Sequence, residues 1–432
     1  MSNIGIIAEF NPFHQGHLYL MDYARQTLKA NTIVVALGHE FTQRGDVALL
    51  DRYTRAASAR LCGADLVLGM PLAASCASAE VFARCGVALL AAAGCDKILC
   101  GWEGSQAMVP SIEKALLFEI ASLLSEEPKD YKKVLSEQLK TGKSYPAART
   151  NAVLSCISSD SKKAIARDLL SSPNNILALE YARAIHDLSL PLELVLLARK
   201  GSDYHSTRIT KDFYASATSI RQKLASMEVL YQKGTLKPDQ FRQSLSPHMP
   251  QESYQLLEQA FIKKLLLFPS DVDILLHTKL FEKEELTTFA DCTEDLQNRI
   301  LKNRDQYIGY EAFADLLKNK SLTRSRITRV LTHILLGITD EDLTLLKRRD
   351  YAPYFWILAA SAKGKGYMGV LKQKDLPLFC SINEISSSLN MEKSDTRRLL
   401  ALDLKASEVV RILRIHKCRR PLPTEYTRKV VL

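Results

Sequence analysis

Short apolar runs alternate with amphipathic stretches along the first 235 residues of the chain. Five runs have the length and apolar character of buried strands: 4–9, 32–38, 64–70, 97–100 and 192–198. The other stretches repeat apolar residues at helical spacing: 17–29, 52–62, 78–93, 111–140 with a break near Pro128, 175–188 and 219–233. Strands that alternate with helices are typical of a parallel sheet. We therefore predict an α/β domain with a doubly wound parallel sheet over residues 1–235.

The strand signal fades after residue 235. Residues 236–258 contain Pro238, Pro247 and Pro250, so we predict irregular structure and a domain boundary there. Amphipathic helices are expected over 260–350, and later strands and helices are expected at 354–360, 376–381, 390–400 and 406–416. This predicts a catalytic domain at 1–235, a helical linker region at 236–300 and a mainly helical region at 301–432.

Composition places the chain among globular proteins. Of its 432 residues, 47% are hydrophobic and 25% are charged, which excludes a disordered or collagen-like chain. No run approaches the roughly 18 apolar residues of a membrane helix, so we expect no membrane association. No signal peptide is visible at the start, and the nine cysteines form no CxxC pair. These features favour a cytoplasmic protein with free thiols.

Basic residues are concentrated in the last third of the chain. The formal net charge is +10 overall, and residues 301–432 carry +11 while residues 1–300 carry −1. A basic region joined to a neutral one is typical of an enzyme with a module that binds a polyanion such as RNA. The alternative is a basic surface that is simply solvated.

The motif with the clearest chemistry follows the first predicted strand. The segment Asn11-Pro12-Phe13-His14-Gln15-Gly16-His17 puts two histidines around a glycine at the start of a helix. Ligands of parallel sheets bind at the carboxyl ends of the strands. A helix start offers free N–H groups, Gly16 lets a phosphate approach the backbone, and imidazoles donate hydrogen bonds to phosphate oxygens. The motif therefore predicts a nucleotide site for attack on an α-phosphate; the alternative is a chance pair of histidines.

Two further segments carry polar residues at helix starts. Ala215–Arg221 (ASATSIR) opens a late helix of the same region, and its Thr218 and Arg221 suit the distal phosphates of ATP. An ordinary Ser/Thr N-cap is the alternative. Asp51 and Arg55, four residues apart, are interpreted as an ion pair on one helix face.

The HxGH motif with the later segment resembles the nucleotidylyltransferase superfamily. Longer strings resemble the bacterial tRNA(Met) cytidine acetate ligase family in order along nearly the whole chain. They are GIIAEFNPFHQGHLYL (5–20), FTQRGDVALLDRYTRA (41–56), GADLVLGMP (63–71), PNNILALEY (173–181), RKGSDYH (199–205) and TRSRITRVLTHILLG (323–337). The fold expected is thus an HxGH nucleotidylyltransferase domain with a basic, mostly helical C-terminal region.

The resemblance implies an activity. The family uses ATP to activate acetate as acetyl-adenylate and transfers the acetyl group to N4 of the wobble cytidine of elongator tRNA(Met). His14 and His17 are the implied catalytic residues, and Mg²⁺ is expected with ATP, although no carboxylate cluster predicts a metal held by the protein. The implied ATP-binding residues, to which the helix-start argument adds Thr218 and Arg221, are Ile7, Ala8, Glu9, Phe10, Asn11, Pro12, Phe13, His14, Gln15, Gly16, His17, Leu18, Tyr19, Leu20, Gly101, Asn174 and Arg199. Asn175 is the alternative to Asn174.

Two basic clusters are candidates for binding tRNA phosphates. Their members are Lys320, Arg324, Arg326, Arg329, Arg411, Arg414 and Lys417. The chain lacks the aromatic signatures of sheet-based RNA modules, so helices are expected to hold the RNA. Two other functions stay open: an adenylyltransferase of the HxGH superfamily that acts on a small molecule, and an RNA-binding protein with a vestigial nucleotide site.

Overall fold

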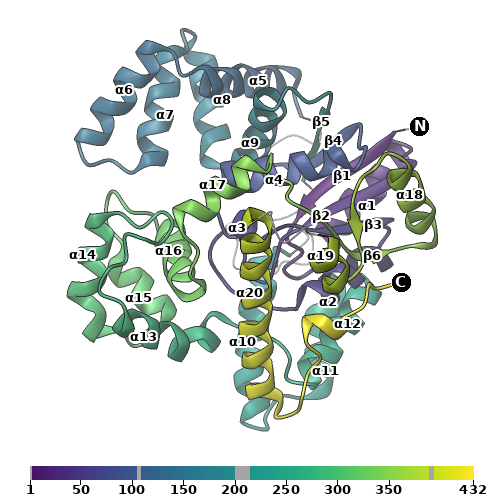
Figure 1. Cartoon of the computed structure of the whole chain (residues 1–432). Helices are drawn as coiled ribbons and strands as arrows, with labels where there is room; N and C mark the ends of the chain where they lie inside the picture. The colour runs from purple at the N-terminus through teal and green to yellow at the C-terminus, as the bar shows by residue number, and fades with distance from the viewer. Residues whose placement is uncertain (1, 105–108, 200–214, 389–393) are drawn as a thin grey trace.

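A central seven-stranded sheet organises the computed structural model, which describes residues 2–104, 109–199, 215–388 and 394–432 (Figure 1). The strand order is β5-β4-β1-β2-β3-β6-β7. The first five strands are parallel: β1 (Asn3–Ala8), β2 (Thr32–Leu37), β3 (Leu66–Gly69), β4 (Lys97–Trp102) and β5 (Glu193–Ala198). All five strands predicted before residue 235 are present, and the doubly wound α/β prediction is confirmed.

Helices cover the sheet because its strands are apolar on both sides. Every residue of β2 and β3 is buried, which is typical of a strand that is packed on both faces. The helices that connect the parallel strands are α1 (Gln15–Asp22), which continues as a π-helical turn (Tyr23–Thr27), α2 (Arg52–Leu61), α3 (Leu72–Ser75), α4 (Ala79–Ala92) and α9 (Pro173–Asp187).

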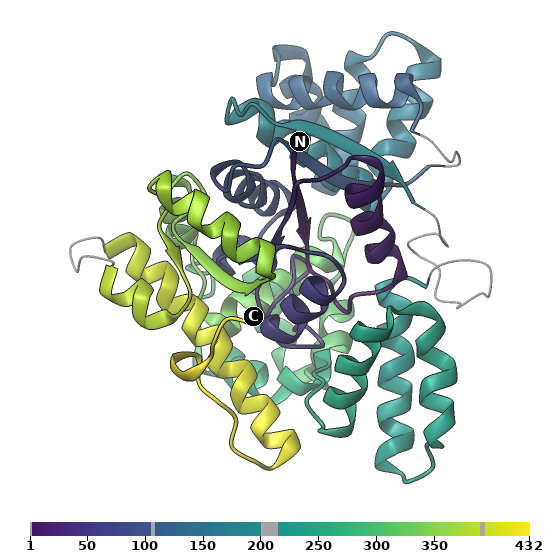
Figure 2. The same ribbon diagram turned by 90° about the vertical axis from the view of Figure 1, so that its right-hand side faces the viewer.

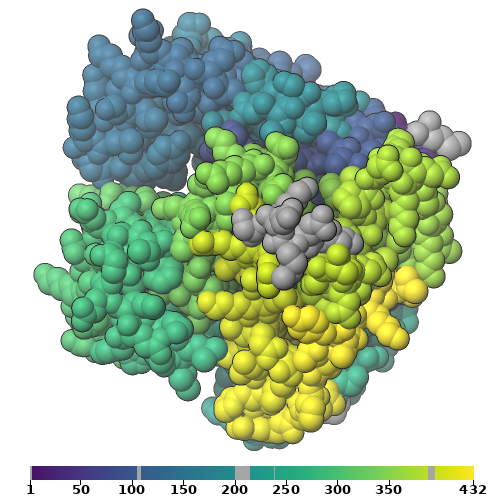
Figure 3. Space-filling view, viewed as in Figure 1, coloured from purple at the N-terminus to yellow at the C-terminus, as the bar shows by residue number. Residues whose placement is uncertain are grey.

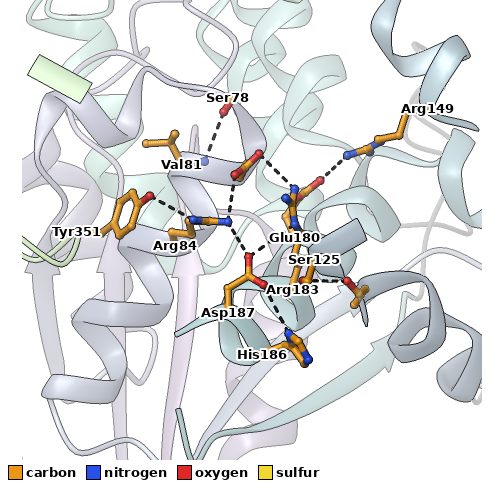
Figure 4. Close-up of polar contacts among 12 residues, drawn as sticks. Ser78, Val81, Arg84, Ser125, Arg149, Glu180, Arg183, His186, Asp187 and Tyr351 are labelled. Carbon is orange, nitrogen blue, oxygen red and sulfur yellow. Dashed lines mark hydrogen bonds and ion pairs between the residues drawn. The ribbon is translucent and has the colours of Figure 1, made fainter. Parts of the chain in front are cut away.

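Four helices form an insertion between β4 and α9. They are α5 (Ser111–Glu126), α6 (Lys129–Lys140), α7 (Tyr145–Cys156) and α8 (Asp160–Ser171), and the predicted break near Pro128 separates α5 from α6. A network of charged side chains fastens this insertion to the sheet helices (Figure 4). Arg149 of α7 pairs with Glu180 of α9 at 2.6 Å, and Arg84 of α4 pairs with Asp187 of α9 at 2.6 Å. The Arg84 side chain also donates to the Tyr351 hydroxyl, which brings the last third of the chain into the same network.

The region after residue 215 begins with helices rather than with a structureless boundary. Helices α10 (Ala217–Gln232), α11 (Pro238–Leu245) and α12 (Gln251–Ile262) share a small apolar core that also includes Leu49 and Leu50. The prediction of irregular structure over 236–258 is therefore wrong. Pro238 is the first residue of α11, and Pro250 precedes α12. Backbone N–H groups at these positions have no partner within the helix, so proline, which lacks an N–H, costs no hydrogen bond there. Figure 2 shows these helices and the insertion at opposite ends of the molecule.

Five more helices follow as predicted for 260–350. They are α13 (Asp273–Glu282), α14 (Glu294–Asn303), α15 (Tyr310–Leu317), α16 (Arg324–Leu336) and α17 (Asp340–Arg348). In the space-filling view a notch separates the insertion from the helices around α14 (Figure 3).

The last third of the chain completes the sheet. Strand β6 (Phe355–Ala360) pairs antiparallel with β3, and β7 (Leu378–Phe379) pairs parallel with β6. The chain end adds Val431, whose carbonyl accepts from the Ala360 N–H at 3.0 Å. The remaining helices are α18 (Ala362–Gln373), α19 (Ile382–Ser388) and α20 (Ser394–Cys418). The separate helices predicted at 390–400 and 406–416 are one helix, α20, and the boundaries at 235 and 300 stay predictions.

None of the helices in the described ranges is long and apolar enough to span a bilayer.

Candidate active site

The loop after β1 lies at the point where the order of the parallel strands in the sheet reverses direction. From β1 the chain proceeds to β2 and β3 on one side, whereas β4 and β5 lie on the other side. Loops that leave neighbouring strands in opposite directions open a crevice at the carboxyl edge of the sheet. The predicted HxGH loop therefore lies at the position where this fold binds ligands.

His14 and His17 form a stacked pair at the start of α1. His14 is the N-cap of the helix, and its Nδ1 accepts a hydrogen bond from the Gly16 N–H at 3.0 Å. The Nδ1 of His17 accepts from the His14 N–H at 3.2 Å, so the two histidines form a reciprocal capping box. Their rings lie 3.8 Å apart at 26°, and the ring of Phe10 packs 4.8 Å from His17. The capping bonds hold both rings in one orientation.

These hydrogen bonds determine which ring nitrogen carries the proton. Burial, and to a smaller degree the positive charge of Arg199, lower the pKa of His17 to about 3. The pKa of His14 is also well below its usual value, chiefly because of burial and then because of His17. Both rings are therefore neutral at physiological pH, and each Nδ1 acts as an acceptor. The proton is on Nε2, and neither Nε2 has an acceptor among the described residues.

Gly16 is needed for the position of the His14 ring. A Cβ at residue 16 would lie 2.9 Å from Cε1 and 3.1 Å from Nδ1 of His14. The space that a side chain at residue 16 would occupy is taken by the His14 imidazole, whereas the sequence predicts a phosphate next to this backbone. A second constraint precedes the motif, because Phe10 has a left-handed φ of 46° although it is not a glycine. Such backbone conformations persist where packing enforces them, and they cluster at functional sites.

The late segment 215–221 contacts the HxGH loop, as predicted. Ser216 caps α10 by accepting from the Ser219 N–H at 3.1 Å. Arg221 donates through Nη1 to the carbonyl of Asn11 at 2.8 Å and through Nη2 to Thr218 Oγ1 at 3.2 Å. Residues 210 positions apart in sequence thus share one site, with a guanidinium beside the histidine pair.

The residues implied at the ends of β4 and β5 also come together. Gly101 is in β4 and lies beside the Arg199 side chain. A Cβ added at Gly101 would lie 3.5 Å from Cγ of Arg199, which is an ordinary contact distance. Arg199 Nη1 pairs with Glu103 Oε1 at 3.0 Å, and Asn174 donates to the same oxygen. Asn175 accepts from the Glu103 N–H and donates to the Glu103 carbonyl, both at 2.8 Å. Because both ends of its amide are occupied, the geometry favours Asn174 over Asn175 as a ligand contact.

The rest of the segment 7–20 divides between support and site. Ile7 packs against the backbone of α4 at Gly86, and Leu18, Tyr19 and Leu20 pack against the main core. Glu9 accepts from the Gln43 N–H at 2.7 Å and so ties β1 to the loop after β2. Ala8, Pro12 and Gln15 lie between these anchors. The ATP assignments of all these residues stay predictions.

Arg55 has a role that the sequence argument missed. Its buried guanidinium donates to the carbonyls of Glu9, Gly38, His39 and Leu50 at 2.6–3.1 Å. Asp51 instead caps α2 through the N–H groups of Tyr53 and Thr54. The interpretation of Asp51 and Arg55 as an ion pair is therefore wrong. Arg55 fastens the ends of β1 and β2, and contacts between positions up to 46 residues apart leave no local signal.

Basic helix α16 packs against the loop that follows β2. Thr328 Oγ1 donates to the Arg44 carbonyl at 2.6 Å, and Thr332 Oγ1 donates to the Gly45 carbonyl at 2.5 Å. Gly45 has a φ of 87°, and a Cβ there would lie 2.5 Å from the backbone of Thr328. The close approach requires a glycine and places the first candidate RNA-binding cluster beside the nucleotide site.

Most of the candidate tRNA-binding side chains have protein partners. Arg324 pairs with Asp315 at 3.0 Å, Arg326 donates to the Asp291 carbonyl at 3.2 Å, and Arg329 lies 3.7 Å from the Asp291 carboxylate. In the second cluster Arg411 pairs with Glu408, and Lys417 pairs with Glu228 and Asp271. Lys320 is exposed and has no partner among the described residues. These assignments stay predictions.

Arg414 is the exception within the second cluster because it lies in the interior. It is only 4% exposed, and its Nε donates to the Leu265 carbonyl at 2.9 Å. Its Nη1 lies 3.9 Å from the buried Glu40 carboxylate. A side chain in this position cannot reach an RNA phosphate without a rearrangement.

A doubly wound parallel sheet with neutral histidines and two arginines at its switch point is the arrangement of an HxGH nucleotidyltransferase. The model of the family HIGH Nucleotidyl Transferase matches residues 1–422. The tRNA(Met) cytidine acetate ligase of Acetivibrio thermocellus is 30% identical over 442 residues and covers 100% of both chains. That of Lysinibacillus sphaericus is 31% identical over 414 residues, 95% of this chain and 94% of the relative.

Solved structures have the same fold. The apo form of Thermotoga maritima TmcAL matches 100% of this chain and 99% of its own, with a TM-score of 0.86 and 24% identity. The same protein bound with alpha-thio ATP matches 97% and 96%, with a TM-score of 0.82. The chain belongs to the HIGH nucleotidyl transferase family and, within it, to the tRNA(Met) cytidine acetate ligases.

Proposed function

We propose that the chain is an ATP-dependent ligase that activates acetate as acetyl-adenylate and acetylates N4 of the wobble cytidine of elongator tRNA(Met). The observation that carries the proposal is the convergence of two neutral imidazoles with two arginines. Arg199 and Arg221 both lower the pKa of His14, so their charges act at the pair. The names of the relatives agree with this activity.

In the first step, an acetate oxygen attacks the α-phosphorus of ATP. The bond from that phosphorus to the bridging oxygen breaks, and pyrophosphate leaves with the electron pair. The Nε2–H groups of His14 and His17 stabilise the negative charge that builds on the α-phosphate. Arg221 and Thr218 hold the distal phosphates, and Arg199 with Asn174 binds at the other side of the crevice.

In the second step, the N4 amine of the cytidine attacks the acetyl carbon, loses a proton and releases AMP. The RNA approaches along α16, which contacts the loop after β2 at the edge of the nucleotide site. The contact supports a role for the basic cluster in orienting an anticodon loop next to the adenylate.

We propose that Mg²⁺ accompanies ATP through the phosphates. Within the described ranges no three His, Cys, Asp or Glu side chains converge as a metal site. The ion supplies charge neutralisation on the phosphates when bound. A tRNA substrate implies work in the cytoplasm.

Isotope exchange between pyrophosphate and ATP tests the proposal, followed by incubation with labelled acetate, ATP and total tRNA. We expect exchange that requires acetate, and label in N4-acetylcytidine after nucleoside analysis. Exchange that requires a mononucleotide or phosphopantetheine instead would identify a small-molecule adenylyltransferase. No exchange with any acid would contradict an active nucleotide site.

A further inference from the structure

Glu103 lies at the junction of three elements of the proposed ATP site. It follows β4 directly, Asn174 and Asn175 open α9, and Arg199 follows β5. The carboxylate of Glu103 accepts from Arg199 Nη1 at 3.0 Å and from the amide of Asn174 at the same oxygen. One acid thus connects two side chains that are separated by 25 positions and lie on different elements.

The backbone of Glu103 is itself held in place. The buried side chain of Asn175 bonds both the N–H and the carbonyl of Glu103 at 2.8 Å. Trp102, the residue before Glu103, is also held at both its backbone and its side chain. Its carbonyl accepts from the Arg199 N–H at 2.9 Å, and its indole N–H donates to the Glu113 carboxylate at 2.9 Å. A carboxylate on a fixed backbone fixes the groups that bind to it.

The electrostatic setting shows why a fixed Arg199 matters. Its charge lowers the pKa of both His14 and His17, so the guanidinium lies near the histidine pair. Within the described ranges Glu103 is the one acid that pairs with it. The bond uses Nη1 alone, which leaves the rest of the guanidinium to face a ligand. An unpaired arginine has many rotamers, and fixing one beforehand removes an entropic penalty from ligand binding.

We propose that Glu103 is a positioning residue for ATP: it orients Arg199 and Asn174 before the nucleotide arrives. The proposal rests on the proposed function, because it takes these two side chains as ATP contacts. Glu103 does not touch the reacting atoms. Its removal therefore weakens ATP binding far more than it slows the chemistry of bound ATP.

The test compares Glu103→Ala and Glu103→Gln with the unchanged chain. Glutamine keeps an oxygen that accepts from Arg199 and Asn174, whereas alanine removes it. We expect Glu103→Ala to raise the Kd for ATP and the KM in pyrophosphate exchange about tenfold, with kcat changed less than threefold. Glu103→Gln should recover most of the loss. The matched control is Glu113→Gln, which alters a carboxylate bound to the neighbouring Trp102 but not to Arg199 or Asn174.

The outcomes separate positioning from other roles. An unchanged ATP Kd in Glu103→Ala overturns the proposal, as does a fall in kcat at constant KM. An equal loss of thermal stability in both Glu103 variants, with ATP affinity preserved, would assign Glu103 a purely structural role and also overturn it. If the unchanged chain binds no ATP, the proposed function fails and this proposal with it, whereas equal ATP binding by unchanged chain and Glu103→Ala refutes only the positioning role.

Discussion

The cations of the nucleotide site and those of the basic last third have different environments. Arg199 and Arg221 each bond few protein groups and direct charge at the neutral histidines of the HxGH loop. In the last third, where the sequence is most basic, Arg411 and Lys417 pair with acids, and Arg414 is buried. The first 300 residues carry a net charge of −1 and the last 132 carry +11, yet the two arginines that act on the histidine pair are in the first region.

The contrast shows that net charge locates a basic region but not the charge that is available to a ligand. Some basic residues of the last third join α20 to other parts of the fold, as Arg414 joins it to Glu40 and Lys417 joins it to Asp271. Available charge depends on partners from distant parts of the chain.

Loss of an imidazole should separate catalysis from RNA binding. His17→Ala removes a donor to the α-phosphate, and we expect acetyl-adenylate formation to fall by about 10²–10³-fold. The affinity for tRNA should stay nearly unchanged. Pyrophosphate exchange and filter binding measure the two quantities, with His186→Ala as the control on an exposed histidine. A parallel loss of tRNA affinity would show that His17 has a structural role.

Removal of the buried arginine should affect stability rather than RNA affinity. Arg414→Leu leaves the Glu40 carboxylate buried without its partner, and we expect the free energy of unfolding to fall by about 2–4 kcal/mol. Urea denaturation measures this change. Arg420→Leu, at an exposed position near the end of the same region, should alter stability by less than about 0.5 kcal/mol. Equal effects of the two changes would contradict the structural role of Arg414.

Acid should destabilise the fold through the histidine pair. The pKa of His17 is about 3 in the folded chain against an ordinary value of 6.5, and that of His14 is also lowered. Between those values the unfolded chain binds more protons, so stability is complete above about pH 6.5 and decreases as the pH falls. We expect a loss of about 1 kcal/mol per ring between pH 6.5 and 5.5. Urea midpoints across this range measure it, and a smaller slope in His17→Gln would support the assignment.

An exposed lysine should have the smallest effect. Lys320→Ala is expected to weaken tRNA binding by a few-fold, to reduce the dependence of log K on log salt by about one unit and to leave stability unchanged. Binding at several salt concentrations measures this. A salt dependence identical to that of the unchanged chain would remove Lys320 from the interface.

The features that sequence could predict are local. The HxGH loop follows a strand and precedes a helix within one continuous segment, so its place at the sheet edge follows from the pattern of apolar residues. Arg221 could be proposed from the polar helix start that it shares with Thr218, whereas Arg199 required the resemblance to a known family. Nothing in their spacing shows that Arg221 would reach the Asn11 carbonyl.

The features that sequence missed depend on distant contacts or on misread prolines. Glu103 and Arg55 act through partners up to 96 and 46 positions away. Pro238 and Pro250 were interpreted as helix breakers although proline is favourable at a helix start. Strand β6 was predicted, but its antiparallel pairing with β3 was not. The two strands are nearly 300 residues apart in sequence, and the pairing of such distant strands leaves no pattern in either local segment.

The central claim is that two neutral imidazoles present Nε2–H groups to a triphosphate. Nitrogen-edited NMR of protein with ¹⁵N-labelled histidine, recorded at pH 7 with and without ATP, tests it most directly. We expect two rings with the proton on Nε2, whose Nε2 resonances shift when ATP is added and disappear in the His14→Ala and His17→Ala chains. A doubly protonated ring at either position, or ATP binding that leaves both rings unperturbed, would contradict it.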